Sequence, residues 1–213
     1  MRRRLLIIVL VMLLTGCTKI DESSNDYNQL IVGCLSKKTI TNNVALGYKY
    51  YVPKGVKLIK NYDYNQVFLI DDEYLYLYVD ITSYYYKNKL TYENSDGSYY
   101  YSKISYDDKK GYIKIINDDY GYFVKMVYNY SKIEVYTDYE SLNKVISLGT
   151  IILNNIDYNN KVIKKVMNES LGSFSEVTYE VDKPDDASNN FSQYLEEYVQ
   201  EEDNDSSEQL PDE

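Results

Sequence analysis

The alternation of apolar and aromatic positions between residues 73 and 80 is the clearest structural signal in this chain. One set of alternate positions is aliphatic and the other is tyrosine: Leu75, Leu77 and Val79 against Tyr74, Tyr76 and Tyr78. A period of two residues is that of a β-strand whose successive side chains point to opposite faces. The sequence therefore predicts a strand with one aliphatic face and one tyrosine face.

Further strand patterns run through the first part of a segment from residue 45 to 172, which we expect to form one domain. They cover residues 47–52, 90–92, 99–106, 112–116, 122–130 and 132–136. Pro53 ends the first of them, and clusters rich in Asp, Asn and Gly separate the later ones. Such clusters between apolar runs are typical of hairpin turns. We therefore expect a meander of antiparallel strands.

The hydrophobic period changes after residue 137. Thr137 and Glu140 have the spacing of a helix capping box. Apolar residues then recur at helical spacing over 142–156 and again over 162–167, with an end near Gly172. Strands followed by helices predict an α+β fold, an antiparallel sheet (a hairpin meander) with helices packed on one face. We expect the aliphatic side of the strands to face the helices and the tyrosine side to face outward.

The segments on either side of this domain have a different character. Residues 17–44 combine a polar tether with a short helical pattern formed by Tyr27, Leu30, Ile31, Cys34 and Leu35. Residues 173–213 are acidic, with twelve acids from Asp182 onward against Lys183. That composition is typical of a largely disordered tail, and apolar residues at helical spacing over 190–199 predict a short helix within it.

Residues 1–16 have the three parts of a signal peptide. Three arginines at 2–4 precede an apolar run from Leu5 to Leu14, which is too short to span a bilayer. Leu14, Thr15, Gly16 and Cys17 follow the pattern of a lipoprotein cleavage site, so the segment resembles a bacterial lipoprotein signal peptide. The resemblance implies that Cys17 carries diacylglycerol, with palmitate among the acyl chains, and anchors the chain on the extracytoplasmic face of the cell membrane. An ordinary secretory signal followed by an incidental cysteine is the alternative.

The order of elements carries a second resemblance. A strand over 47–55, then hairpins, then a helix ending over 152–156 resembles a Mog1/PsbP-like domain across about residues 45–160. The chain is also similar to uncharacterised small lipoproteins of low-GC Gram-positive bacteria. These likenesses imply a binding or assembly module and transfer no functional residue. A Gram-positive source would place the anchor in the outer leaflet of the cell membrane.

Composition excludes several functions. The formal charge is −10, and without the leader 20 lysines face 33 acids, a charge of −13. Such a field repels nucleic acid, so we expect no nucleic-acid partner. The chain has no histidine, which excludes Ser-His and Cys-His catalysis and the common histidine zinc sites. With Cys17 lipidated, Cys34 has no disulfide partner and is interpreted as a small buried hydrophobe.

Carboxylate chemistry stays open. Adjacent acids at 71–72, 107–108 and 118–119 are candidate Ca²⁺ ligands, but each pair falls in an expected turn and none forms an EF-hand loop. We therefore expect no metal, no cofactor and no assigned catalytic residue, and favour a protein that is not an enzyme. The alternative is a carboxylate-dependent cell-envelope hydrolase, which needs two carboxylates across a cleft.

The tyrosine face is the candidate binding surface. Tyr74, Tyr76 and Tyr78 stand in a row, and rings with hydroxyl tips suit interfaces that are partly wet. A cell-wall glycan or another envelope protein is the expected partner, besides the membrane itself. The alternative is structural: tyrosine favours strands, and 28 tyrosines beside many Asn, Lys and Ile are typical of an AT-rich genome. The expected function is that of a membrane-anchored extracytoplasmic lipoprotein that binds or assembles a partner at the cell surface.

Overall fold

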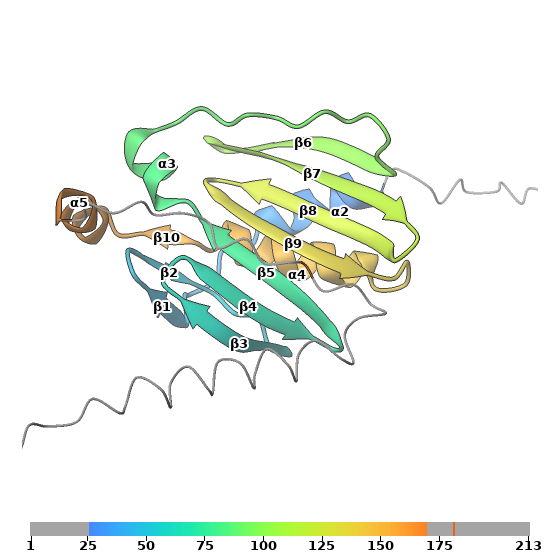
Figure 1. The fold of residues 1–213 in the computed structure, drawn as a ribbon, viewed down its shortest axis with the longest axis horizontal. Coiled ribbons are helices and arrows are strands. Elements are labelled where there is room, and N and C mark those ends of the chain that lie inside the picture. The colour runs from blue at the N-terminus through green and yellow to red at the C-terminus, as the bar shows by residue number, and fades with distance from the viewer. Residues whose placement is uncertain (1–25, 170–180, 182–213) are drawn as a thin grey trace, which may run out of the picture.

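The computed structural model describes residues 26–169 and Val181. Figure 1 shows their arrangement as two sheets with helices packed around them. The helices are α2 (Asp26–Leu35), α3 (Ile81–Tyr86), α4 (Leu142–Asn154) and α5 (Asn160–Glu169). The strands are β1 (Asn43–Ala45), β2 (Tyr48–Tyr50), β3 (Val56–Tyr62), β4 (Asn65–Ile70), β5 (Glu73–Val79), β6 (Tyr100–Tyr106), β7 (Lys109–Asp118), β8 (Gly121–Tyr128), β9 (Ser131–Thr137) and β10 (Asp157–Tyr158). The predicted α+β class is confirmed.

The larger sheet has seven strands in the order β3-β4-β5-β9-β8-β7-β6, and all neighbours are antiparallel. Strands β6 to β9 follow one another along the chain and in space, so the predicted meander is confirmed. Strand β5 closes onto β9, with Tyr76 opposite Glu134 and Tyr78 opposite Lys132. This junction places the tyrosine row beside the charged outer side of the meander.

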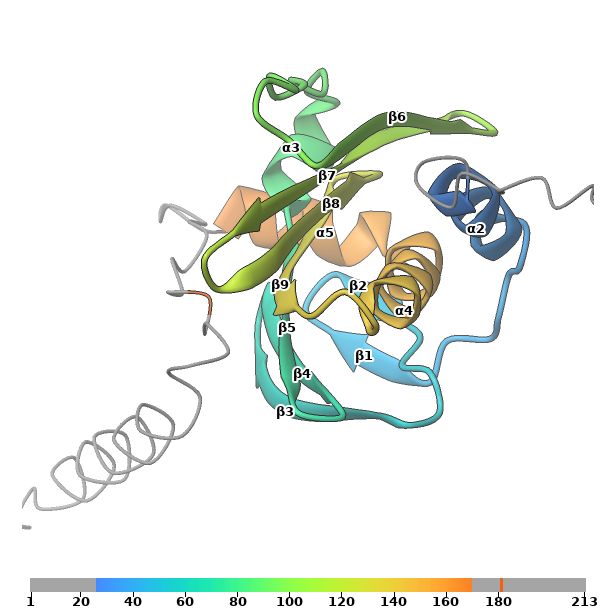
Figure 2. The same ribbon diagram turned by 90° about the vertical axis from the view of Figure 1, so that its right-hand side faces the viewer.

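The inner face of the large sheet holds the core. Leu75, Leu77 and Val79 on β5 are at most 2% exposed, and Ile133 and Val135 on β9 are fully buried. Helix α4 lies in the concave side of the sheet, which curves around it in Figure 2. The aliphatic face therefore packs against the helices, as the alternation predicted.

Two further elements close this core. Helix α2 packs beside α4, where the Asn154 side chain donates hydrogen bonds to the backbone oxygens of Leu35 and Lys37. The small sheet β1-β2-β10 contributes Tyr50, whose buried ring lies 6.2 Å from that of Phe68. The helix predicted around Tyr27 to Leu35 is confirmed as α2.

Three local expectations were wrong or incomplete. Residues 90–92 form no strand, because no neighbouring strand of the described chain pairs with them. The capping box fails because β9 continues through Thr137, and the carboxylate of Asp138 accepts from the Ser141 N–H instead. Strands β3 and β4 were not predicted. Helices α4 and α5 were predicted close to their observed bounds.

Among the described residues, no helix has the length and apolar character needed to cross a bilayer. Cys17, the acidic tail from residue 182 and the helix predicted over 190–199 lie outside the described residues.

Candidate functional site

The tyrosine row predicted on β5 lies on the outer face of the large sheet. Tyr74, Tyr76 and Tyr78 are all half-buried there, opposite the aliphatic side chains of the same strand. Tyr78 lines a pocket on this face, whereas Tyr74 and Tyr76 are not among the residues that line it and lie farther along the strand. The structure thus connects one end of the predicted row to a cavity.

This pocket has a volume of about 760 Å³ and lies between the outer face and residues 87–92. These residues begin a segment without helix or strand, residues 87–99, which we call the strap; it runs from α3 to the start of β6 (Figure 1). Four tyrosines, from β5, the strap, β7 and the β8–β9 turn, line the pocket: Tyr78, Tyr92, Tyr112 and Tyr130. Leu90 and Val127 add apolar surface.

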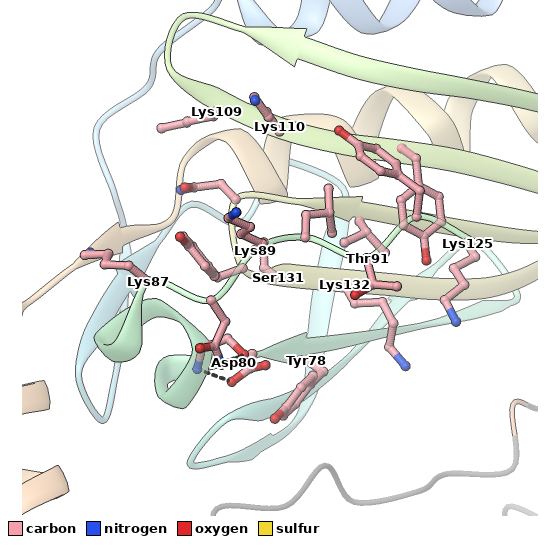
Figure 3. Close-up of a pocket in the computed structure, with 18 of the residues that line it drawn as sticks. Tyr78, Asp80, Lys87, Lys89, Thr91, Lys109, Lys110, Lys125, Ser131 and Lys132 are labelled. Carbon is pink, nitrogen blue, oxygen red and sulfur yellow. Dashed lines mark hydrogen bonds between the residues drawn. The ribbon is translucent and has the colours of Figure 1, made fainter. Parts of the chain in front are cut away.

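Six lysines also line the pocket, against two acids. They are Lys87, Lys89, Lys109, Lys110, Lys125 and Lys132, and the acids are Asp80 and Asp108. In Figure 3 the first four lie in one half of the view, whereas Lys125 and Lys132 lie in the other. The residues that line the pocket therefore carry an excess of positive charge, which would attract an anion.

At one end of the pocket the lysines are already neutralised. The Nζ atom of Lys125 lies 2.7 Å from a carboxylate oxygen of Glu93 on the strap and 3.1 Å from one of Glu134, and Lys132 lies 2.9 Å from Glu134. Burial alone would raise the pKa of Glu93, but the hydrogen bond and charge of Lys125 outweigh burial and lower that pKa. This end holds the strap onto the sheet.

The lysines at the other end are not neutralised in this way. Within the part of the chain that the structure describes, Lys89, Lys109 and Lys110 form no salt bridge. Burial, followed by the charge of Lys38, lowers the pKa of Lys109. The neighbouring Lys87 places its ammonium 3.7 Å from the ring centre of Tyr84. The charges of Asp108, Asp107 and Asp157 act on the pKa of Lys109 in the opposite direction without cancelling the effect of burial.

Aromatic contacts hold the middle of the strap. The rings of Tyr92 and Tyr112 lie 6.0 Å apart, and the ammonium of Lys103 lies 4.8 Å from the centre of the Tyr92 ring. Glu93 also lies 3.7 Å from Lys114. The strap covers the pocket through side-chain contacts, since it adds no strand to the sheet.

The β8–β9 turn presents a tyrosine to the pocket at a conformational cost. Asn129 and Tyr130 both have positive φ, the left-handed conformation of a two-residue hairpin turn in which glycine is favoured at the second position. A side chain in that conformation costs about 1–2 kcal/mol. The Tyr130 ring packs edge-on against Tyr84, with 5.6 Å between centres. The hydroxyl of Tyr158 donates to the backbone oxygen of Asn129 and braces the turn.

The acid pairs lie in turns, as predicted, except that Asp118 is the last residue of β7. Residues 71–72, 107–108 and 118–119 stand at the β4–β5, β6–β7 and β7–β8 connections. The described residues contain no group of three or more side chains arranged to hold a metal ion. Glu73 lies outside the residues that line the pocket; burial raises its pKa, and Thr137 donates a hydrogen bond to its carboxylate. Cys34 is buried, which confirms its interpretation as a small hydrophobe.

Sequence reasoning missed the lysines of the pocket. Lys125 and Lys132 share the outer face only because β8 pairs with β9 in the register Val127 opposite Lys132 and Lys125 opposite Glu134. The signal was present in the alternation of charged and aliphatic residues along both strands. A scan against protein-family models and searches of curated proteins and of solved structures each found no match to this chain.

Proposed function

We propose that this chain is a lipid-anchored binding module of the cell envelope, held at the extracytoplasmic face of the membrane through Cys17. Its ligand is a cell-wall glycan or another envelope component, and the pocket of the outer face takes it. The observation that carries the proposal is the pocket itself, in which tyrosine walls combine with lysines that form no salt bridge with any described residue. Such a mixture of apolar walls and a few convergent polar groups is typical of ligand sites.

The groups in the pocket suit binding better than catalysis. The chain has no histidine to act as a general base, and the carboxylate of Asp80 accepts a hydrogen bond from the Ser83 N–H at the start of α3. Glu73, whose pKa is raised, does not line the pocket. The lysines and tyrosines that line the pocket supply charge and contact area, which are what retention of a ligand requires.

Co-sedimentation with purified Gram-positive cell-wall material tests the pocket. The chain, purified in a neutral detergent, is compared with Tyr78→Ser and with Tyr62→Ser, a control on the exposed side of β3. We expect the wild type and the control to sediment with the wall, and Tyr78→Ser to sediment several-fold less. Equal sedimentation of all three, or none of any, contradicts the proposed function. Release of soluble sugar during incubation would instead favour the alternative, a carboxylate-dependent hydrolase.

Cell fractionation tests the anchor separately. We expect the wild-type chain in the membrane fraction, with acyl chains on an N-terminal peptide that begins at Cys17. Replacement of Cys17 by Ser removes the thiol that would carry the lipid, so the variant should leave the membrane fraction. Retention of Cys17→Ser in the membrane fraction, with no acylated peptide in the wild type, contradicts lipid anchoring.

A further inference from the structure

We propose that the ligand of the pocket is a sugar that carries a phosphate or carboxylate group, with its anion beside Lys89 and Lys110 and its ring against the tyrosines. This inference rests on the proposed function and specifies the chemistry of its ligand. Two features of the pocket support it. Lys89 and Lys110 line it and form no salt bridge with any described residue, and its tyrosine wall includes a residue with a strained backbone, Tyr130.

The anion position follows from the distribution of ion pairs. Glu93 already supplies a carboxylate to Lys125 and Lys114, so a ligand would have to displace it to bind at that end. Lys110 at the start of β7 lies on the same face of the sheet as Tyr112, two residues on, whereas Lys109 has the register of the buried Ile113. Lys89 on the strap also lines the pocket and lies in the same half of the view as Lys110 (Figure 3). Ammonium groups bind phosphate and carboxylate through charge-assisted hydrogen bonds. The end of the pocket away from Glu93 is therefore where an incoming anion gains most.

The ring position follows from the β8–β9 turn. Glycine in place of Tyr130 would remove the strain of a positive φ, yet the chain has a tyrosine there that lines the pocket. Strained residues of this kind cluster at ligand sites, where the side chain serves a role that a relaxed residue cannot. Tyr78 and Tyr112 also line the pocket, from two strands of the sheet. Rings with hydroxyl tips suit a sugar, which has both C–H faces and hydroxyl groups.

Calorimetric titration with defined compounds tests the ligand class. The purified chain in neutral detergent is titrated with glucose 6-phosphate, glucuronate, glucose and inorganic phosphate. We expect the two acidic sugars to bind. Glucose lacks the anion and inorganic phosphate lacks the sugar ring, so each should bind at least about tenfold more weakly than the acidic sugars. If inorganic phosphate binds as tightly as glucose 6-phosphate, the pocket does not recognise the sugar and the proposal is overturned. If glucose binds more tightly than the two acidic sugars, the pocket does not recognise the anion and the proposal is overturned. Absence of binding by both acidic sugars overturns the proposal.

Matched variants locate the interaction. The double variant Lys89→Gln with Lys110→Gln should weaken glucose 6-phosphate binding about tenfold, as expected for two lost charge-assisted hydrogen bonds. Lys54→Gln with Lys57→Gln removes the same charge at exposed positions outside the pocket and should change affinity less than about twofold. If both double variants lose the same affinity for glucose 6-phosphate, binding depends only on net charge, and the proposed anion site is overturned. Unfolding in urea checks that all variants are folded.

The inference and the proposed function fail in different ways. If wall material is retained through Tyr78 but the Lys89 and Lys110 double variant retains it equally well, the binding function stands and the acidic-sugar ligand is wrong. If no wall material is retained at all, the proposed function fails, whatever the outcome with glucose 6-phosphate. Sedimentation with vesicles of anionic phospholipid is the final arm; binding that the lysine double variant abolishes would assign the site to a lipid headgroup and overturn the sugar.

Discussion

Strand β5 has seven residues, and its two faces have different roles. The inner face contributes to folding stability, and the outer face contributes to the proposed binding pocket. On the inner face, Leu75, Leu77 and Val79 are buried against the helices, where burial of apolar surface drives folding. On the outer face, Tyr74, Tyr76 and Tyr78 are half-buried beside a row of charged side chains on β9. The same backbone therefore supplies the core through one set of positions and the pocket through the other. Changes on the inner face should affect folding first, and changes on the outer face should affect binding first.

The largest effect should come from truncation on the inner face. Leu77→Ala leaves a cavity in the buried core and should lower the free energy of unfolding by about 2–5 kcal/mol. Tyr78→Ser, at the next position, should cost less than half as much, because its side chain is only half-buried. Urea unfolding followed by circular dichroism measures both. Equal costs would remove the distinction between the two faces.

The outer face should depend on pH through Glu93. Because the pKa of this carboxyl is lowered in the folded chain, its stabilising effect is present above the unfolded pKa and is lost as pH falls through the folded pKa. Glu93→Gln should therefore destabilise the chain by about 1 kcal/mol or less at neutral pH, and by less in acid. Hydrogen exchange of the strap, residues 87–99, should become faster in the variant. Unchanged exchange at neutral pH would show that Glu93 does not hold the strap.

Glu73, at the start of β5, should respond to pH with the opposite sign. Burial raises the pKa of its carboxyl, with the nearby acids Asp138 and Asp71 adding to this, so stability is highest below the unfolded pKa and falls as pH rises through the folded pKa. Glu73→Gln keeps an acceptor for Thr137 and removes the charge. We expect it to raise the free energy of unfolding at neutral pH and to leave it unchanged in acid. If Glu73→Gln lowered the free energy of unfolding at neutral pH, the predicted direction of the effect would be wrong.

The smallest effect on stability should come from Tyr130→Gly. Relief of the positive φ contributes about 1 kcal/mol. Loss of the edge-on contact with the Tyr84 ring costs about 1 kcal/mol as well. The free energy of unfolding should therefore change little, whereas binding of glucose 6-phosphate should weaken several-fold. A large loss of stability without a change in binding would make Tyr130 a structural residue.

The sequence predicted those parts of the fold whose signal is local. The alternation in β5, the Asx-rich turns of the meander and the helical spacing of α4 each lie within one element. Strand β4 was missed because five of its six residues are buried, so it shows no alternation. Residues 90–92 have the composition of a strand, and only the absence of a partner strand among the described residues places them in the strap.

The candidate site was predictable only in part, for the same reason. Tyr78 was predicted to lie on the outer face because the alternation of aliphatic and tyrosine positions within β5 assigns each side chain to a face. The lysines that face it come from the strap, the β6–β7 hairpin and two meander strands, and only the strand register brings them together. The strained turn at Tyr130 carries no local signal, because the sequence Asn-Tyr at 129–130 does not have the glycine that such a turn favours.

Hydrogen exchange with and without bound wall fragments tests most directly whether the outer face is the binding face. The chain is labelled alone and with solubilised cell-wall fragments, and exchange is compared peptide by peptide by mass spectrometry. We predict slower exchange in three segments that line the pocket, residues 87–92, 108–112 and 127–132, with little change in α2 and α4. Slower exchange confined to α2, α4 or the small sheet, with the three pocket segments unchanged, would contradict the account.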